Sequence, residues 1–243
     1  MLKIDSVYLR IGGSSILNGV NFEVQAGEKV GLIGPNGSGK TTLFNCISGF
    51  NSLTLGKILF KGEDISKLSP SARAHKGLGR VFQNFGVFRE MTLMENMLVA
   101  FESKQKLNFL PWSKDTKKNK ASALEFLSLV KLEAKADSKA SSLSGGQMRL
   151  LEIARALAFG SDLLLLDEPT AGVSPKMKLE IETTLLKLQE LKKTYIVIEH
   201  DINFIQRICD RVLVLDQGKV ELDNTPELVR ADSKLQDIYF GVA

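Results

Sequence analysis

Short, strongly apolar runs alternate with stretches of helical periodicity along most of this chain after residue 30. The run Lys29–Ile33 leads into a glycine-rich turn, and the stretch Asp162–Asp167 has an unbroken apolar centre. Tyr195–Glu199 and Val212–Leu215 are further apolar runs. Such runs are typical of strands buried on both faces. Because strand-like and helical stretches alternate, the pattern predicts an α/β fold with a mostly parallel sheet.

Two regions depart from this alternation. Near the N-terminus, the segments Lys3–Arg10, Asn21–Gln25 and Lys57–Phe60 alternate between apolar and polar residues, which predicts an antiparallel β subdomain beside the main sheet. Between about residues 90 and 160 the apolar positions recur at helical spacing instead. We therefore expect one domain, in which residues 1–89 and 161–243 form the α/β core and about 90–160 form an inserted helical subdomain. One predicted helix carries Leu124, Leu127, Leu129 and Leu132, and another carries Leu150, Ile153, Ala154 and Leu157.

The composition is that of a globular domain. The chain has 243 residues, of which 44% are hydrophobic and 25% charged. Its apolar runs, such as Leu163–Leu166, are far shorter than the roughly 20 residues that a membrane-spanning helix needs. The N-terminus lacks the apolar stretch of a signal peptide, and the two cysteines show no spacing for pairing or metal binding. We expect a cytosolic protein that would reach a membrane only through a partner.

The charge is concentrated in one segment. The net charge is +4, which is too small to indicate binding to nucleic acid. Between Glu102 and Lys120 there are six lysines and only two acidic residues, so this segment accounts for the whole excess. It also contains Trp112, the only tryptophan. The composition predicts a solvated loop, and contact with anionic lipid or with a protein partner is the alternative.

The glycine-rich turn after Lys29–Ile33 carries the first candidate chemistry. Its glycines let backbone N–H groups approach phosphate oxygens, and the helix predicted over Thr41–Ser48 points its positive end at the same place. We expect Lys40 to reach the β- and γ-phosphates of a nucleotide, and the Thr41 hydroxyl to bind Mg²⁺. A chance turn would explain the glycines but not the strand and helix around them. The predicted nucleotide-binding residues here are Gly34, Pro35, Asn36, Gly37, Ser38, Gly39, Lys40, Thr41 and Thr42.

Polar residues also follow the apolar runs farther along the chain. Asp167 and Glu168 end the Leu163–Leu166 run, and His200 ends the next one. Open α/β sheets bind ligands at the carboxyl ends of their strands, so these side chains are predicted to lie at the binding edge. Gln83 follows a shorter β-like run. Taken singly, each of these residues could be an ordinary polar residue at the end of a strand.

A second motif, Leu143–Gln147, reads Leu-Ser-Gly-Gly-Gln and opens a predicted helix. A serine and two glycines at a helix N-terminus form an anion site. In this order after the phosphate loop, the motif resembles the ATP-binding cassettes of ABC transporters, and the resemblance covers nearly the whole chain. It implies a P-loop NTPase core that hydrolyses ATP with Mg²⁺.

The resemblance also implies roles for individual residues. Asp167 would support Mg²⁺ through water, and Glu168 would polarise the attacking water as general base. Gln83 would sense both the metal and that water, and His200 would contact the γ-phosphate. The implied catalytic residues are therefore Glu168, His200 and Gln83, and the implied metal-site residues are Thr41, Gln83 and Asp167.

The motif at Leu143–Gln147 implies a dimer. Cassettes of this family pair head to tail, so each ATP lies between the phosphate loop of one and the Ser-Gly-Gly turn of the other. The nucleotide-binding set then gains Ser144, Gly145, Gly146 and Gln147. The second subunit would be a copy of this chain or a paralogue. Hydrolysis would remove the phosphate that bridges the two and so open the pair.

Two positions depart from the family pattern. Ile11 stands where the family usually carries an aromatic residue under adenine, so we expect weaker stacking on the base. Ser174 stands where many relatives carry aspartate. It brings no charge to the loop that connects the two ATP sites of the dimer. The second change is expected to alter coupling between the sites rather than hydrolysis.

Several segments resemble the cassettes of branched-chain amino acid importers in particular. They are Leu43–Cys46, Gly77–Asn84, Val87–Val99, Leu151–Arg155 and Ile238–Gly241. The resemblance implies a peripheral protein at the cytoplasmic face of the inner or plasma membrane, with permease subunits as partners and, indirectly, a substrate-binding protein. Cassettes of lipopolysaccharide or lipid exporters share part of this pattern and remain an alternative. A soluble ATPase without a permease is a further alternative.

Apolar residues cluster just after Gln83. They are either core residues or the lining of a groove that accepts a short cytoplasmic helix of the permease. The residues are Phe85, Val87, Phe88, Met91, Leu93 and Met94.

Overall fold

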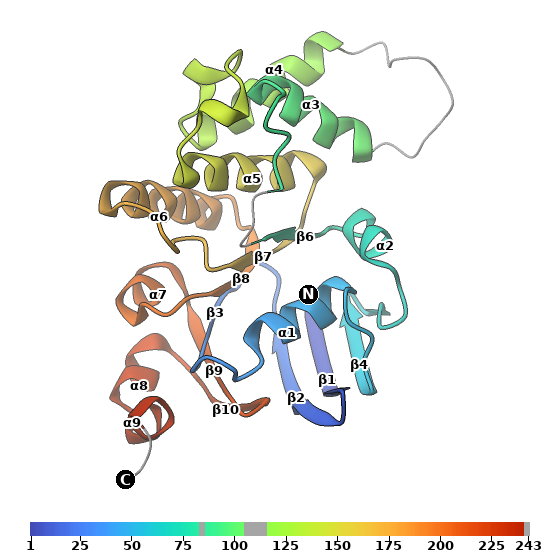
Figure 1. The fold of residues 1–243 in the computed structure, drawn as a ribbon, viewed down its shortest axis with the longest axis vertical. Helices are drawn as coiled ribbons and strands as arrows, with labels where there is room; N and C mark the ends of the chain where they lie inside the picture. The colour runs from blue at the N-terminus through green and yellow to red at the C-terminus, as the bar shows by residue number, and fades with distance from the viewer. Residues whose placement is uncertain (83–85, 105–115, 241–243) are drawn as a thin grey trace.

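The computed structural model describes residues 1–82, 86–104 and 116–240, and Figure 1 shows how their elements are arranged. The strands are β1 (Leu2–Ile11), β2 (Ser14–Val24), β3 (Lys29–Ile33), β4 (Leu55–Phe60), β5 (Glu63–Asp64), β6 (Leu78–Val81), β7 (Leu163–Asp167), β8 (Thr194–Ile198), β9 (Arg211–Asp216) and β10 (Lys219–Asn224). The α-helices are α1 (Lys40–Ser48), α2 (Pro70–His75), α3 (Leu93–Lys104), α4 (Thr116–Leu129), α5 (Gly145–Phe159), α6 (Pro175–Glu190), α7 (Ile202–Ile208), α8 (Pro226–Ala231) and α9 (Ser233–Phe240). Short 3₁₀ helices span Glu133–Lys135 and Ala140–Ser142.

The main sheet has the strand order β10-β9-β3-β8-β7-β6 and is parallel from β9 to β6, with β10 antiparallel to β9. The prediction of a mostly parallel sheet is therefore confirmed. The leucines of β7 alternate between its two faces. Leu164 and Leu166 pack into a core with the helices, whereas Leu163 and Leu165 pack into a second core with the N-terminal strands. Burial on both faces is the reason that this strand is an unbroken apolar run.

The N-terminal strands form a separate antiparallel sheet with the order β2-β1-β4-β5. This confirms the antiparallel β subdomain. Apolar residues of β1, β2 and β4 share one core with α1 and one face of the main sheet. The turn between β3 and α1 is thereby fixed between two sheets.

Helices α3, α4 and α5 follow β6 and precede β7, and they form the upper part of the molecule in Figure 1. The inserted helical subdomain is therefore present. One detail of its prediction is wrong, because α4 ends at Leu129 and Leu132 lies beyond it. Lys131 has a positive φ of 59°, which no α-helix can continue through, and Leu132 is buried after that turn.

The lysine-rich segment is only partly described. Residues 105–115, including Trp112, lie outside the described residues. On either side of them the chain is helical rather than a loop, since α3 extends to Lys104 and α4 begins at Thr116.

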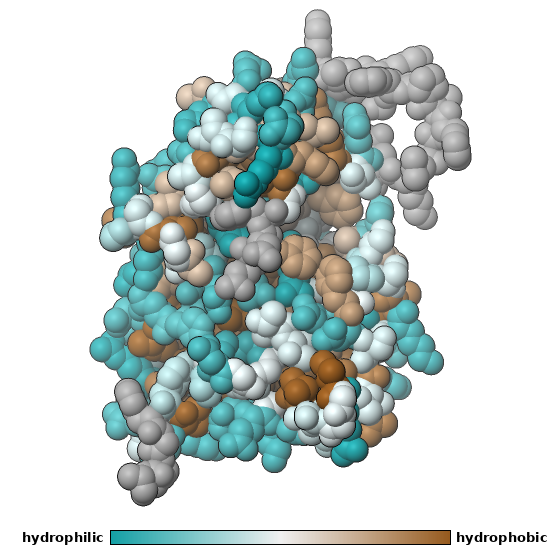
Figure 2. Space-filling view, viewed as in Figure 1, coloured by the Kyte–Doolittle hydropathy of each residue, from teal (hydrophilic) through white to brown (hydrophobic). Residues whose placement is uncertain are grey.

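Hydrophilic and hydrophobic side chains are mixed on the surface. Figure 2 shows hydrophobic residues in small separate patches among hydrophilic ones on this face. Among the described residues, no helix is both long and apolar enough to cross a membrane.

Candidate nucleotide site

The phosphate loop joins the end of β3 to the start of α1, as the sequence predicts. Gly34 has φ +151° and Gly37 has φ +84°, a region that side-chain-bearing residues rarely adopt. At Gly34 an added Cβ would lie 2.0 Å from the carbonyl oxygen of Leu215, whereas at Gly37 it would meet nothing within 4 Å. Gly34 is therefore required by packing, and Gly37 by the conformation of the loop.

The loop curls around the ammonium group of its own lysine. Lys40 Nζ donates hydrogen bonds to the carbonyl oxygens of Gly34, at 2.8 Å, and Pro35, at 2.9 Å. Burial lowers the pKa of Lys40, and the charges of Glu168 and Asp167 oppose that shift. The hydroxyl of Ser38 is buried without a hydrogen-bond partner. An unpaired hydroxyl, a buried ammonium and a helix N-terminus together fit a bound phosphate chain.

Asp167 ends β7 and is 3% exposed. Burial raises the pKa of Asp167, and the Arg80 guanidinium acts in the opposite direction. The Arg80 Nη2 atom lies 2.9 Å from Asp167 Oδ2, and its Nη1 atom lies 2.6 Å from Asn45 Oδ1 in α1. This arginine comes from the neighbouring strand β6, and sequence reasoning gave it no role.

Glu168 and His200 meet, although they are far apart in the sequence. His200 Nε2 lies 3.0 Å from Glu168 Oε1, and the N–H of Glu168 donates to the carbonyl oxygen of Ile198 at the end of β8. Glu168 has φ +48°, which is strained for a residue with a side chain and is a feature found at functional sites. The neighbouring strands β7 and β8 thus deliver the predicted base and the predicted histidine to one place.

Gln83 lies outside the described residues, but α5 holds the chain on either side of it. Arg149 donates to the carbonyl oxygen of Phe82, and the N–H of Gly86 donates to Glu152. Arg149 and Glu152 form a buried ion pair at 2.9 Å. Burial raises the pKa of Glu152, and the hydrogen bond from Gly86 opposes that shift. Sequence reasoning missed this pair, although two charged residues on the apolar face of a predicted helix were a signal.

The Leu143–Gln147 motif forms a helix N-terminus, as predicted. The Ser144 hydroxyl accepts from the Gln147 N–H at 3.3 Å, and Gln147 Oε1 accepts from the Ser144 N–H at 3.3 Å. These two hydrogen bonds form a capping box. Gln147 therefore stabilises the start of α5 in addition to its predicted role in nucleotide binding. At Gly146 an added Cβ would lie 1.8 Å from Cγ of Met177 in α6, so only glycine fits there.

The two motifs do not meet within one chain. Figure 1 places α5 in the upper, helical part, whereas the turn between β3 and α1 lies in the lower part. An anion site at Ser144 is therefore far from the phosphate loop of the same molecule.

The two departures from the family pattern have different structural settings. Ile11 ends β1 and is 54% exposed. A hollow of about 900 Å³ beside Gly37 is lined by Tyr8 and Ile16. Ser174 is the N-cap of α6 and accepts from the Met177 N–H at 3.3 Å. Serine and aspartate cap helices about equally well, so the local fold does not need the aspartate.

Two further residues support the site. Glu199 is buried and accepts from the N–H and the hydroxyl of Thr170, at 2.9 and 2.7 Å, which fixes the loop that follows Glu168. Burial raises the pKa of Glu199, and the bonds from Thr170 oppose that shift. Tyr239 in α9 accepts a hydrogen bond from the N–H of Gly34 at 3.0 Å. Neither contact was predicted, because no local pattern links such distant positions.

Side-chain oxygen atoms near the phosphate loop could bind a magnesium ion whose other ligands are phosphate oxygens. No group of three or more histidine, cysteine or acidic side chains among the described residues could hold a metal ion by itself. Magnesium is commonly bound by one or two carboxylates together with substrate phosphates and water. Asp167 and the hydroxyl of Thr41 are donors of that kind.

Comparison with known proteins places the chain in a family. The model of the ABC transporter family matches residues 17–171. The chain is 39% identical to the high-affinity branched-chain amino acid transport ATP-binding protein BraF of Pseudomonas aeruginosa, over 100% of this chain and 98% of BraF.

Solved structures agree. The ADP conformation of MJ1267, an ATP-binding cassette of an ABC transporter, superposes with a TM-score of 0.88 at 32% identity and covers 100% of this chain and 99% of that one. The dimeric post-hydrolysis state of the cassette MJ0796, bound to ADP and Pi, has a TM-score of 0.80 at 31% identity and covers 93% of this chain and 99% of that one. With its phosphate loop, its acidic strand end and its capped second motif, the chain belongs to the ABC transporter family as one of its nucleotide-binding, ATP-hydrolysing cassettes.

Proposed function

We propose that this chain powers the import of branched-chain amino acids through a membrane permease. The observation that carries the proposal is the full-length similarity, at 39% identity, to a cassette named for that transport. The chain would act as a peripheral subunit at the cytoplasmic face, because the relatives it resembles are ATP-binding proteins of a membrane transport system. A substrate-binding protein would select the amino acid outside the membrane.

In the proposed reaction, the backbone of the phosphate loop and Lys40 bind the phosphates of ATP. Lys40 would exchange its two loop carbonyls for phosphate oxygens, which are the stronger acceptors. Thr41 and Asp167 would hold Mg²⁺, whose charge offsets that of the phosphates. Thr42 would contribute a further contact to the phosphates.

Glu168 would take the proton of the attacking water, and His200 would orient Glu168 and contact the γ-phosphate. The support for this pairing is the 3.0 Å contact between the two side chains. We propose that Gln83 completes the site, because its neighbours in sequence are held by Arg149 and Glu152.

We also propose that two cassettes pair head to tail. The N-terminus of α5 would then approach the γ-phosphate bound by the other subunit, with Ser144, Gly145 and Gly146 as its anion site. The separation of the two motifs within one chain and the dimeric form of MJ0796 support this arrangement. In this proposal residues about 90–160 act as one helical unit that carries the anion site.

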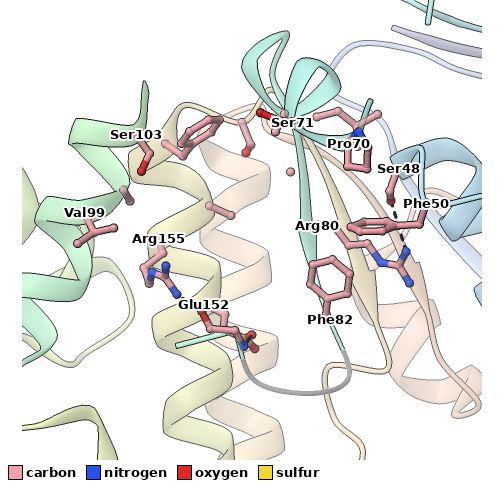
Figure 3. A pocket seen from close by; sticks show the side chains of 18 residues that line it. Ser48, Phe50, Pro70, Ser71, Arg80, Phe82, Val99, Ser103, Glu152 and Arg155 are labelled. Atoms are coloured by element: carbon pink, nitrogen blue, oxygen red, sulfur yellow. Dashed lines mark hydrogen bonds between the residues drawn. The ribbon is translucent and has the colours of Figure 1, made fainter. Parts of the chain in front are cut away.

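A groove offers a place for the permease. It has a volume of about 390 Å³ and lies between α2, α3, α5 and β6, as Figure 3 shows. Its lining includes Phe50, Phe82, Val99 and Gly86. We propose that a short cytoplasmic helix of the permease docks here, because apolar grooves of this kind accept amphipathic helices.

The apolar residues after Gln83 divide between core and surface. Leu93 is buried, and Val87 and Met94 are partly buried against the core. Phe88 and Met91 are exposed but do not line the groove. Phe85 lies outside the described residues.

A charge in the groove is expected to weaken permease binding. Val99→Asp places a carboxylate among apolar groups, where it must lose water on docking, so we expect the fraction of permease that co-purifies to fall about tenfold. Leu179→Asp on α6 is the matched control, since Leu179 is exposed and lies outside the groove. Thermal unfolding of both variants would establish that they fold. Normal co-purification with Val99→Asp would rule out this groove as the docking site.

Uptake in cells tests the function itself. With the chromosomal copy replaced by Glu168→Gln and its expression checked, we expect uptake of labelled leucine, isoleucine and valine to be lost. The strain should carry no redundant importer. Normal uptake in that strain would rule out amino acid import as the function. Normal uptake together with a defect of the cell envelope would indicate a lipid exporter.

A further inference from the structure

Arg80 occupies an unusual position for a cation in this fold. It lies within β6, next to β7 in the sheet, where Arg80 pairs in register with Leu165. Its side chain is only 6% exposed. A buried arginine is costly unless it is paired and hydrogen-bonded, so its partners indicate what it does.

Those partners come from the two elements that build the nucleotide site. One nitrogen, Nη2, lies 2.9 Å from Oδ2 of Asp167 at the end of β7. The other, Nη1, lies 2.6 Å from Oδ1 of Asn45 in α1, the helix that begins at Lys40. The guanidinium thus joins the acidic strand end to the phosphate-loop helix.

The remaining surface of the guanidinium is covered by aromatic rings. Its carbon lies 4.7 Å from the centre of the Phe82 ring and 6.0 Å from that of Phe50, and those two rings pack edge to face at 5.5 Å. Figure 3 shows Arg80 beside these rings at one wall of the groove. Nη1 also donates to the hydroxyl of Ser48 at the end of α1, at 3.5 Å. Stacking and these directed hydrogen bonds fix a planar guanidinium in a way that a lysine ammonium would not be fixed.

We propose that Arg80 is a positioning residue that holds the Asp167 carboxylate in the orientation needed to support Mg²⁺ at the nucleotide. Partners that hydrogen-bond to a metal-binding carboxylate orient it, and losing one typically weakens metal binding by about 10- to 100-fold. The inference rests on the proposed role of Asp167. Arg80 lies three positions before Gln83 and in the wall of the groove. It would therefore be a further residue on which metal binding depends.

The test measures metal binding without hydrolysis. Mn²⁺ serves as the probe for Mg²⁺, and electron paramagnetic resonance reports the free ion in the presence of ADP. For Arg80→Met we expect the Mn²⁺ concentration at half-saturation to rise at least about tenfold. ADP binding in EDTA should stay within about twofold of the original, because the phosphate loop and Lys40 are untouched. Arg80→Lys should recover part of the loss.

Arg73→Met is the matched control. Arg73 is also a buried arginine bonded to α1, through the carbonyl oxygens of Cys46 and Ile47, but it does not touch Asp167. If Arg73→Met weakened Mn²⁺ binding as much as Arg80→Met, the effect would be one of general packing and the proposal would be wrong. Unchanged Mn²⁺ binding in Arg80→Met would also overturn it.

Two further variants keep the result interpretable. If Arg80→Met does not fold, Asn45→Ala removes the amide oxygen that fixes the guanidinium, and it should weaken Mn²⁺ binding in the same direction. Unchanged Mn²⁺ binding in that folded variant would count against the proposal. Asp167→Asn separates the two hypotheses. If Asp167→Asn leaves Mn²⁺ binding intact, the proposed role of Asp167 is wrong. If Asp167→Asn weakens Mn²⁺ binding but Arg80→Met does not, only the proposed role of Arg80 is wrong.

Discussion

Purified Glu168→Gln is expected to hydrolyse ATP about 1,000-fold more slowly than the original chain while binding it equally well. Glutamine has the shape of glutamate, so the contact with His200 at 3.0 Å can persist as a hydrogen bond to the amide. The amide, however, cannot accept the proton of the attacking water. Release of phosphate under single-turnover conditions would measure the loss, and binding of a fluorescent ATP analogue would measure the affinity.

The same variant should accumulate as an ATP-bound pair. If the γ-phosphate bridges two cassettes, a site that binds but does not cleave it holds them together, and size-exclusion chromatography with ATP should show the dimer. Glu182→Gln is a suitable control, because it also replaces a paired glutamate by its amide: Glu182 pairs with Arg207 of α7 at 2.8 Å, and neither residue belongs to the predicted site. Hydrolysis by Glu168→Gln within about fivefold of the original rate would show that another group is the base.

Local chemistry made much of this molecule predictable. The strand β7 is recognisable because each of its leucines faces one of two cores. The start of α5 is also recognisable, because serine followed three residues later by glutamine is a capping box, and both of its hydrogen bonds are present. In both places the residues that determine the structure are neighbours in the sequence.

Contacts between distant segments were not predictable in this way. Arg80 reads as one charged residue in a short strand, and its pairing with Asp167 depends on β6 lying beside β7, which periodicity does not reveal. Tyr239 reaches Gly34 only because α9 returns to the phosphate loop. The sequence contains the side chains of the site, but the order of the strands decides which of them meet.

Gly34→Ala is expected to lower the free energy of unfolding by about 4 kcal/mol, the combined cost of an overpacked contact and a strained φ. An added Cβ would lie 2.0 Å from the backbone oxygen of Leu215, a distance at which one of the two must move. Neither moves easily, because β3 pairs in register with β9 and the loop follows directly. Urea unfolding without nucleotide, followed by circular dichroism, would measure the change.

Gly37→Ala gives the comparison that isolates the contact. Gly37 also has a positive φ, of 84°, but an added Cβ there meets nothing within 4 Å, so only the conformational cost of about 1–2 kcal/mol remains. Both glycines belong to the same phosphate loop, and both variants add a single methyl group. A similar loss of stability in the two would mean that strain alone makes Gly34 necessary. A clearly larger loss at Gly34 would mean that the first glycine of the loop is required by the close approach of Leu215, independently of any phosphate.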